Sequence, residues 1–263
     1  MIHQPILVFD IETIPDISSL KKVFKIEKKF NDDEVVSIAK YFYRQNRGND
    51  FLPHQFQQIV AISCVLRTKD DVDIWTLGNE DSTESDMLER FFDGLNKYTP
   101  VLVSWNGNGF DLPVINYRSL FNAIEGGIYF DQGEQNNDFK FNNYINRYHQ
   151  RHVDLMDTLA IFSGRANASL DNIAKLSGFP GKLEMDGSDV YENFKAGNLI
   201  DIRNYCETDV ANTYLVYLKF LLFKNQITKQ DYVMELNKFK SKILEMNLKH
   251  FNEFVAAWDK AEI

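Results

Sequence analysis

A short apolar run followed at once by two acidic residues is the feature that most constrains the fold. Residues 6–9 read Ile-Leu-Val-Phe, which is typical of a buried strand, and Asp10 and Glu12 come directly after them. On an extended backbone, residues two apart point to the same side, so both carboxylates share one side of the strand. Like charges this close raise each other's pKa unless a cation intervenes. The pair therefore indicates either a solvated strand end or a cation site, and alone it favours the solvated end.

The rest of the chain alternates strand-like and helix-like segments, which favours one α/β domain over residues 1–222. Further strands are expected at 59–67, 72–77, 101–103 and 153–155, and helices after Thr83, at 112–121, and at about 169–177, 188–196 and 199–222. The charged segment 16–50 is interpreted as an insertion, and the polar segment 126–148 as a loop or lid. Residues 223–263 are expected to form one long helix whose wide apolar face packs on the same domain, with partner binding as the alternative.

Two more groups of polar residues follow predicted elements. Asp111 comes after the 101–103 strand and an Asn-Gly-Asn-Gly-Phe turn, so it either caps the next helix or reaches the edge of the sheet where Asp10 lies. Tyr205 and Asp209 are four residues apart, which places them on the same face of a helix. Each pattern is weak alone, and their order along the chain is what makes them informative.

Together these segments resemble the three exonuclease motifs of the DEDD superfamily of 3′–5′ exonucleases. The matching residues are Phe9-Asp10-Ile11-Glu12-Thr13, then Trp105-Asn106-Gly107-Asn108-Gly109-Phe110-Asp111, then Tyr205-x-x-x-Asp209. The pattern is most similar to the proofreading exonuclease domain of family-B DNA polymerases and to stand-alone proteins predicted to be related to it. Segments 147–157 and 178–188 also resemble the stand-alone group, so the resemblance covers most of residues 5–222.

The resemblance implies an RNase H-like α/β fold, a mixed central sheet flanked by helices, here with an extra C-terminal helix. It implies that Asp10, Glu12 and Asp209 hold one divalent ion, that Asp10 bridges to a second, and that Asp111 acts mainly through coordinated water. Tyr205 matches the DEDDy branch, because the DEDDh branch has a His where this chain has Cys206. The residues expected to contact the substrate are Thr13, Asn106 and Phe110 at the terminal nucleotide, and Lys182, which is either a phosphate contact or an ordinary surface lysine.

The residue types suit phosphodiester hydrolysis. Two Mg²⁺ or Mn²⁺ ions, about 3.5–4 Å apart, lower the pKa of water and stabilise both the attacking and the leaving oxygen. Hard divalent ions prefer carboxylate oxygens, which explains four acids without a His or Cys ligand.

Three other motifs fit less well. Asp10-Ile11-Glu12-Thr13 is similar to the haloacid-dehalogenase phosphatase signature, but that family does not explain Asp111 or Asp209. Gly181-Lys182 lacks the following Ser or Thr of a phosphate-binding loop. Gly107-x-Gly109 lacks the third glycine of the dinucleotide fingerprint.

The charge of the chain bears on its substrate. The net charge of −9 argues against tight binding of long nucleic acid, yet residues 139–182 hold six Lys and Arg against three acids, while residues 70–93 hold nine acids against Arg90. The sequence thus favours recognition of a chain end. Sparse cysteines and the absence of a long apolar segment favour a protein of the cytoplasm that is not inserted in a membrane.

The function expected from the sequence is metal-dependent 3′–5′ hydrolysis of single-stranded nucleic acid with release of nucleoside monophosphates; DNA is the favoured substrate and RNA stays open as the alternative. The alternative is a catalytically silent RNase H-like module that binds nucleic acid or acts as a scaffold. A separate repair or replication partner could bind through the C-terminal helix.

Overall fold

A computed structural model describes residues 2, 4–183 and 185–261, apart from the side chain of Arg47. Its centre is one mixed sheet with the strand order β3-β2-β1-β4-β5. The strands are β1 (Ile6–Pro15), β2 (Gln57–Arg67), β3 (Val72–Thr76), β4 (Val101–Ser104) and β5 (His152–Asp154). β1 runs antiparallel to β2 and parallel to β4, so the central strand delivers its C-terminal end beside the loop that follows β4.

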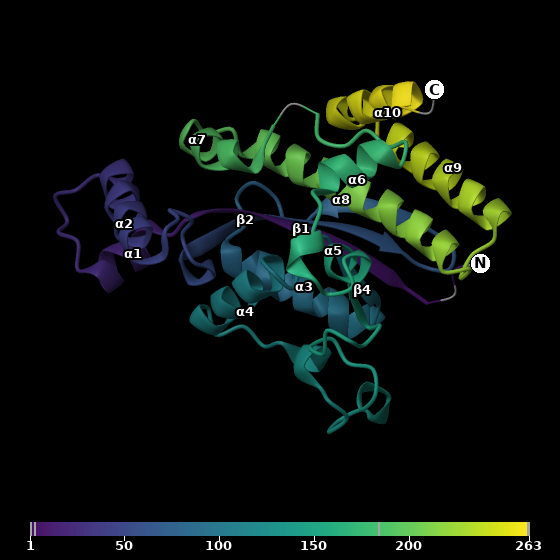
Figure 1. Cartoon of the computed structure of the whole chain (residues 1–263), viewed down its shortest axis with the longest axis horizontal. Helices are drawn as coiled ribbons and strands as arrows, with labels where there is room; N and C mark the ends of the chain where they lie inside the picture. The colour runs from purple at the N-terminus through teal and green to yellow at the C-terminus, as the bar shows by residue number, and fades with distance from the viewer. Residues whose placement is uncertain (1, 3, 184, 262–263) are drawn as a thin grey trace.

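Helices cover both faces of the sheet (Figure 1). One face carries α8 (Leu199–Phe223), with α6 (Leu170–Leu176), α7 (Val190–Lys195), α9 (Lys229–Glu245) and α10 (Lys249–Ala261) packed around it. The other face carries α3 (Glu84–Tyr98) and α4 (Asp111–Phe121), and short α5 (Leu155–Leu159) follows β5. The mixed sheet flanked by helices is therefore confirmed. No helix within the described residues combines the length and the apolar character needed to cross a bilayer.

Alternation along β1 divides the apolar residues between two cores. Val8 belongs to the core under α8, whereas Leu7 and Phe9 belong to the core under α3 and α4. Continuing this period of two places the side chains of Asp10 and Glu12 on the α8 side of the sheet. The buried strand thus aims its two acids at the one helix that carries Tyr205 and Asp209.

Two segments differ from the expectation or add to it. The 16–50 segment forms α1 (Ile17–Phe24) and α2 (Asp32–Arg47), which share a small core of their own that includes Leu20, Val35 and Phe56. Figure 1 shows this pair at one end of the molecule. The single long C-terminal helix is wrong: the chain breaks between α9 and α10, where Asn247 has a φ of 50°. Asparagine is among the few residues that tolerate this left-handed conformation, which ends a helix.

Apolar side chains of both C-terminal helices pack inward. Phe239 and Ile243 of α9, and Phe251 and Trp258 of α10, lie in the same core as α8. Lys242 of α9 also lies 2.6 Å from Asp73 and 3.8 Å from Asp71, both in the β2–β3 hairpin. Part of the acidic hairpin is therefore neutralised by the C-terminal segment.

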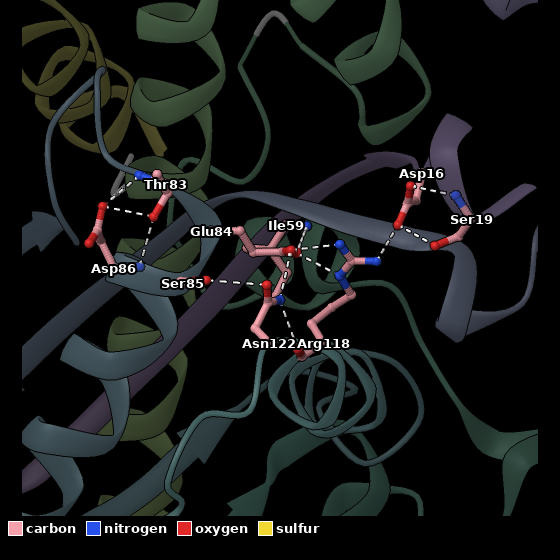
Figure 2. A network of polar contacts seen from close by, with 9 residues as sticks. All are labelled: Asp16, Ser19, Ile59, Thr83, Glu84, Ser85, Asp86, Arg118 and Asn122. Atoms are coloured by element: carbon pink, nitrogen blue, oxygen red, sulfur yellow. Dashed lines mark hydrogen bonds and ion pairs between the residues drawn. The ribbon is translucent and has the colours of Figure 1, made fainter. Parts of the chain in front are cut away.

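A buried polar network joins the start of α1 and the strand β2 to the helices α3 and α4 (Figure 2). Arg118 of α4 donates to both oxygens of Glu84 at 2.8 and 2.6 Å, and to Asp16 at 2.5 Å. Asp16 also caps α1, and Glu84 accepts the backbone N–H of Ile59 at 2.7 Å. Ile59 lies next to a β-bulge opposite Glu12 and Thr13, so Glu84 satisfies a donor that the interrupted ladder leaves free.

Replacing Arg118 by alanine is expected to lower the free energy of unfolding by about 3–5 kcal/mol, because two buried carboxylates lose their cation. Urea denaturation followed by circular dichroism measures this change. Lys195→Ala is the control: this lysine pairs with Asp33 at the surface, and its loss should cost less than about 1 kcal/mol. Equal effects of the two substitutions would show that the network in Figure 2 does not stabilise the fold.

Candidate active site

The four acids predicted from the sequence converge at one place. Asp10 and Glu12 come from β1, Asp111 from the first turn of α4, and Asp209 from the middle of α8. Glu12, Asp111 and Asp209 are buried, and Asp10 is half-buried. Asp111 accepts the backbone N–H of Ile11, between the two β1 acids, at 3.2 Å. The parallel neighbours β1 and β4 therefore bring Asp111 directly to the β1 pair.

The loop between β4 and α4 holds its shape through close backbone contacts. Asn106 has a φ of 65°, and its carbonyl accepts the N–H groups of Gly109 and Phe110 at 2.9 and 3.0 Å. A Cβ atom on Gly107 would lie 2.1 Å from Ser104 Oγ, and one on Gly109 would lie 2.3 Å from Asn106 Oδ1. A Cβ on Gly107 would also lie 2.6 Å from Ser104 Cβ, so this glycine is required by space, whereas the Asn106 side chain could rotate away from a Cβ on Gly109.

Tyr205, Cys206 and Asp209 lie on the face of α8 that turns toward β1. The Cys206 thiol lies 3.5 Å from the carbonyl oxygen of Asp10 and 3.7 Å from its carboxylate, with geometry suited to donation. Burial, followed by the charge of Asp10, raises the pKa of this thiol, so it stays protonated. Cys206 thus supports Asp10 as a hydrogen-bond donor.

The carboxylates raise one another's pKa. Burial, followed by the charges of Asp111, Glu12 and Asp209, raises the pKa of Asp10 well above its usual range. Glu12 shifts in the same direction from burial and the charges of Asp209 and Asp111. Burial also raises the pKa of Asp111 to about 7 and that of Asp209 to about 6. Without a cation, this cluster holds its negative charge at a high electrostatic cost.

The donor set fits divalent metal ions. Ligand atoms of Asp10, Glu12 and Cys206 lie within 4.8 Å of one another. Within the described part of the chain, the buried Oδ1 of Asp209 has no hydrogen-bond partner. A buried carboxylate oxygen without a partner is costly, and a bound cation would satisfy it. Oxygen donors suit Mg²⁺ or Mn²⁺, whereas a protonated thiol is a poor ligand for such ions. The carboxylates, and not Cys206, are therefore the ligands that suit a metal here.

An open cleft of about 320 Å³ leads to the acids. Its lining contains the four acids and, from the predicted substrate contacts, Asn106, Phe110 and Lys182. Lys182 Nζ lies 5.4 Å from the centre of the Tyr205 ring and 3.6 Å from Asp186. Its positive charge lowers the pKa of Glu12 and of Asp209, although burial outweighs it in both. Lys182 therefore belongs to the electrostatic surroundings of the site.

Thr13 lies differently from the other predicted contacts. It follows the β-bulge, its hydroxyl donates to Gln57 at 3.1 Å, and it does not contribute to the cleft lining. Tyr205 does not line this cleft either; it lines a second cavity together with Asn204, Thr208 and His250.

Sequence reasoning assigned no role to Asp154. This buried residue accepts the backbone N–H groups of Asn106 at 3.0 Å and Asn108 at 2.9 Å, and it caps α5. It is a positioning residue for the loop that carries Asn106 and Phe110. The sequence signal that could have identified Asp154 is a carboxylate in a short strand-like segment, a signal similar to the one that identified Asp10. Cys206 was considered only for its place in the motif.

Comparison with known proteins extends these observations. The family model described as a predicted 3′–5′ exonuclease related to the exonuclease domain of PolB matches residues 49–258. No curated protein matches the chain. The matched range includes Asp111, Tyr205 and Asp209 but begins after Asp10 and Glu12, so the family match does not cover the β1 acids. Their place beside the other residues rests on the sequence motif and on the tertiary structure.

A solved structure of similar fold is that of the family B DNA polymerase from the hyperthermophilic archaeon Pyrobaculum calidifontis. The sequence identity is 19% and the TM-score 0.52, over 83% of this chain and 24% of the polymerase chain. This chain thus corresponds to about a quarter of that polymerase, and the likeness shows an RNase H-like α/β fold. The family match over residues 49–258 confirms the resemblance found in the sequence and shows the enzyme class, nuclease: the chain belongs to the predicted 3′–5′ exonucleases related to the exonuclease domain of PolB.

Proposed function

We propose that the protein uses two divalent ions, Mg²⁺ or Mn²⁺, to hydrolyse the last phosphodiester bond at the 3′ end of single-stranded DNA. RNA is the alternative substrate, and nucleoside monophosphates are the products. The observation that carries the proposal is the convergence of four carboxylates from three separate elements, with the buried Asp209 Oδ1 unpartnered within the described residues. A silent binding module would have no use for so costly a cluster.

Each residue of the cluster has a role in the proposal. Asp10, Glu12 and Asp209 would hold one ion, Asp10 would also hold the second, and Asp111 would act mainly through coordinated water. When bound, the ions supply a lowered pKa for water and charge stabilisation at the leaving oxygen. Burial, followed by the charges of Asp209 and Glu12, raises the pKa of the Tyr205 phenol, so this hydroxyl keeps its proton. It can therefore donate a hydrogen bond that orients the attacking water.

The cleft supports a single-stranded end as the substrate. A volume of about 320 Å³ is at the lower end of the range for small-molecule sites, roughly 300–1,000 Å³, and suits about one nucleotide. A base pair is larger than a single nucleotide, so in this proposal the last nucleotide enters the cleft unpaired. Phe110 offers a ring to its base or sugar, and Lys182 a charge to its phosphate. Thr13 would contribute through its backbone, since its hydroxyl is bound to Gln57.

One degradation panel tests the proposal. Single- and double-stranded DNA and RNA, each labelled at either the 5′ or the 3′ end, are incubated with Mg²⁺, with Mn²⁺ and with excess EDTA. The expected result is a ladder shortening from the 3′ end of single strands, with mononucleotide release, only when metal is present. Equal degradation in EDTA would overturn the metal mechanism, and release from the 5′ end would overturn the polarity. Oligonucleotide binding without hydrolysis in either metal would support the silent module.

Tyr205→Phe is expected to lower kcat by about 10²-fold, because the phenylalanine cannot donate to the attacking water. Metal binding should change little, since the four carboxylates remain. The measurements are kcat in Mg²⁺ and the rise in melting temperature on metal addition. An unchanged kcat would remove Tyr205 from the mechanism, and a lost thermal shift would show that it acts through the metal site.

A separate repair or replication partner that binds the C-terminal helices would have to contact their exposed side chains. The apolar residues Phe239 and Trp258 are buried against α8, whereas Val233 and Met234 of α9 are exposed. We therefore place such a partner, if it uses this segment, on the outer face of α9.

A further inference from the structure

An exposed cluster of aromatic rings and a guanidinium lies in the basic part of the chain. The rings of Tyr148 and Phe162 are 5.0 Å apart and nearly perpendicular. The Arg147 guanidinium lies 5.2 Å from the Phe162 ring and 5.9 Å from the Tyr148 ring. Tyr148 is 69% exposed and Phe162 38%. We name these three residues the 147–162 cluster; it combines cation and π-faces at the surface, the chemistry that stacks nucleic-acid bases.

The cluster is tied to the active site by polar contacts. Arg147 donates to Asp157 at 2.6 Å, and the same carboxylate oxygen accepts the side chain of Asn108 at 3.2 Å. Asn108 belongs to the loop that carries Asn106 and Phe110. The ion pair between Arg147 and Asp157 therefore holds the cluster in a fixed position relative to the cleft.

The cluster is also continuous with the rim of the cleft along the chain. Met156 of α5 lines the cleft, and so do residues 168–171 at the start of α6. The segment that joins them, residues 157–167, leaves the rim and returns to it, and it carries Ile161 and Phe162.

The backbone of this segment is strained at its exposed tip. Ile161 and Phe162 have φ values of 51° and 58°, and Ile161 is 83% exposed. Left-handed backbone in a β-branched residue is rare, and such strain concentrates at sites of function. The hydrogen bond from the Phe162 N–H to the Asp157 carbonyl, 2.8 Å long, holds the turn that directs the Phe162 ring toward Arg147.

We propose that the 147–162 cluster is a binding surface for the nucleotides that precede the cleaved bond, with Tyr148 and Phe162 as stacking surfaces and Arg147 as the cation near the backbone. This inference rests on the proposed exonuclease function and adds a second contact region outside the cleft. The cleft holds about one nucleotide, so the next nucleotides of the strand must lie across its rim. The excess of Lys and Arg in residues 139–182 is complementary to their phosphates.

Two substrates separate the cluster from the catalytic centre. The 4-nitrophenyl ester of thymidine 5′-monophosphate carries the bond to be hydrolysed but no preceding nucleotide, whereas an oligothymidylate of about ten nucleotides also reaches the rim. For Tyr148→Ala, we expect KM for the oligonucleotide to rise about tenfold relative to KM for the ester, because one stacking surface is lost. Tyr148→Phe keeps the ring and should restore the wild-type ratio.

Phe141→Ala is the matched control. Phe141 is 80% exposed with Lys140 Nζ 5.5 Å from its ring centre, which repeats the chemistry of the cluster. Among the described residues, no side-chain polar contact ties this pair to the loop of Asn108 in the way that Asp157 ties Arg147 to it. Its KM ratio should stay at the wild-type value. An unchanged ratio for Tyr148→Ala, while wild type hydrolyses both substrates, would overturn this inference alone. Failure of the wild-type protein to hydrolyse either substrate would instead overturn the proposed function.

Discussion

Asp10→Asn and Asp209→Asn are each expected to lower the rate of oligonucleotide hydrolysis by about 10³-fold or more. Asparagine keeps the shape of the side chain but removes a charged ligand, so the site loses several kcal/mol of transition-state stabilisation. The rate of mononucleotide release from a 5′-labelled single strand, in Mg²⁺ and in Mn²⁺, measures the loss. Circular dichroism spectra should match those of the wild type, because neither substitution changes packing volume.

Asp201→Asn provides the control for this pair. Asp201 is an exposed acid in the first turn of α8, the same helix that carries Asp209, so its loss removes an equal charge outside the cluster. Its rate should remain within about twofold of wild type, since surface charges interact weakly through water. Full activity of Asp209→Asn would show that the four carboxylates are not the catalytic centre.

In the absence of metal, Asp209→Asn is expected to stabilise the protein above pH 6. Asp209 has a pKa of about 6 in the folded chain against an ordinary value of 3.8. A raised carboxyl pKa means that the folded state binds more protons between these values, so stability falls as the pH rises from about 4 to 6. At pH 7.5 this penalty amounts to at most about 3 kcal/mol, and asparagine removes it.

Urea denaturation in EDTA at pH 4 and pH 7.5 measures this effect. The free energy of unfolding of Asp209→Asn relative to wild type should be higher at pH 7.5 than at pH 4, where the wild-type carboxyl is already protonated. Adding Mn²⁺ at pH 7.5 should stabilise wild type and leave the variant nearly unchanged, because ligands that bind only the folded state stabilise it. A relative stability that is the same at both pH values would show that burial does not penalise the charged form of Asp209.

Much of the fold could be predicted from short-range patterns. The strand at 101–103 and the hairpin of 59–67 with 72–77 are found at nearly the predicted positions, as β4, β2 and β3. The capping box of Thr83 and Asp86 starts α3 as expected. These features depend on periodicity and on contacts between residues three or four apart, which the sequence displays directly.

Features that depend on long-range packing were beyond such patterns. The 16–50 segment forms two helices because residues such as Leu20 and Phe56 bury one another, and its polar pattern did not reveal this. The break at Asn247 gives two helices, α9 and α10, which both pack against α8, although the apolar residues alone suggested one continuous helix. Propensity is a weak predictor when tertiary contacts compete with it.

The sequence by itself determined which residues could hold divalent ions, because Asp10 and Glu12 follow a buried apolar run and Tyr205 and Asp209 share a helix face. The local pattern left two roles open for Asp111, capping the next helix or reaching the edge of the sheet, and the tertiary structure brings it to Ile11 because β1 and β4 are parallel neighbours. Burial, a property of the assembled core, then raises the pKa of the acids and leaves one oxygen of Asp209 without a hydrogen-bond partner among the described residues. The identity of the acids can be read from the sequence, whereas the electrostatic cost of their charges arises from the burial and the close approach that folding imposes.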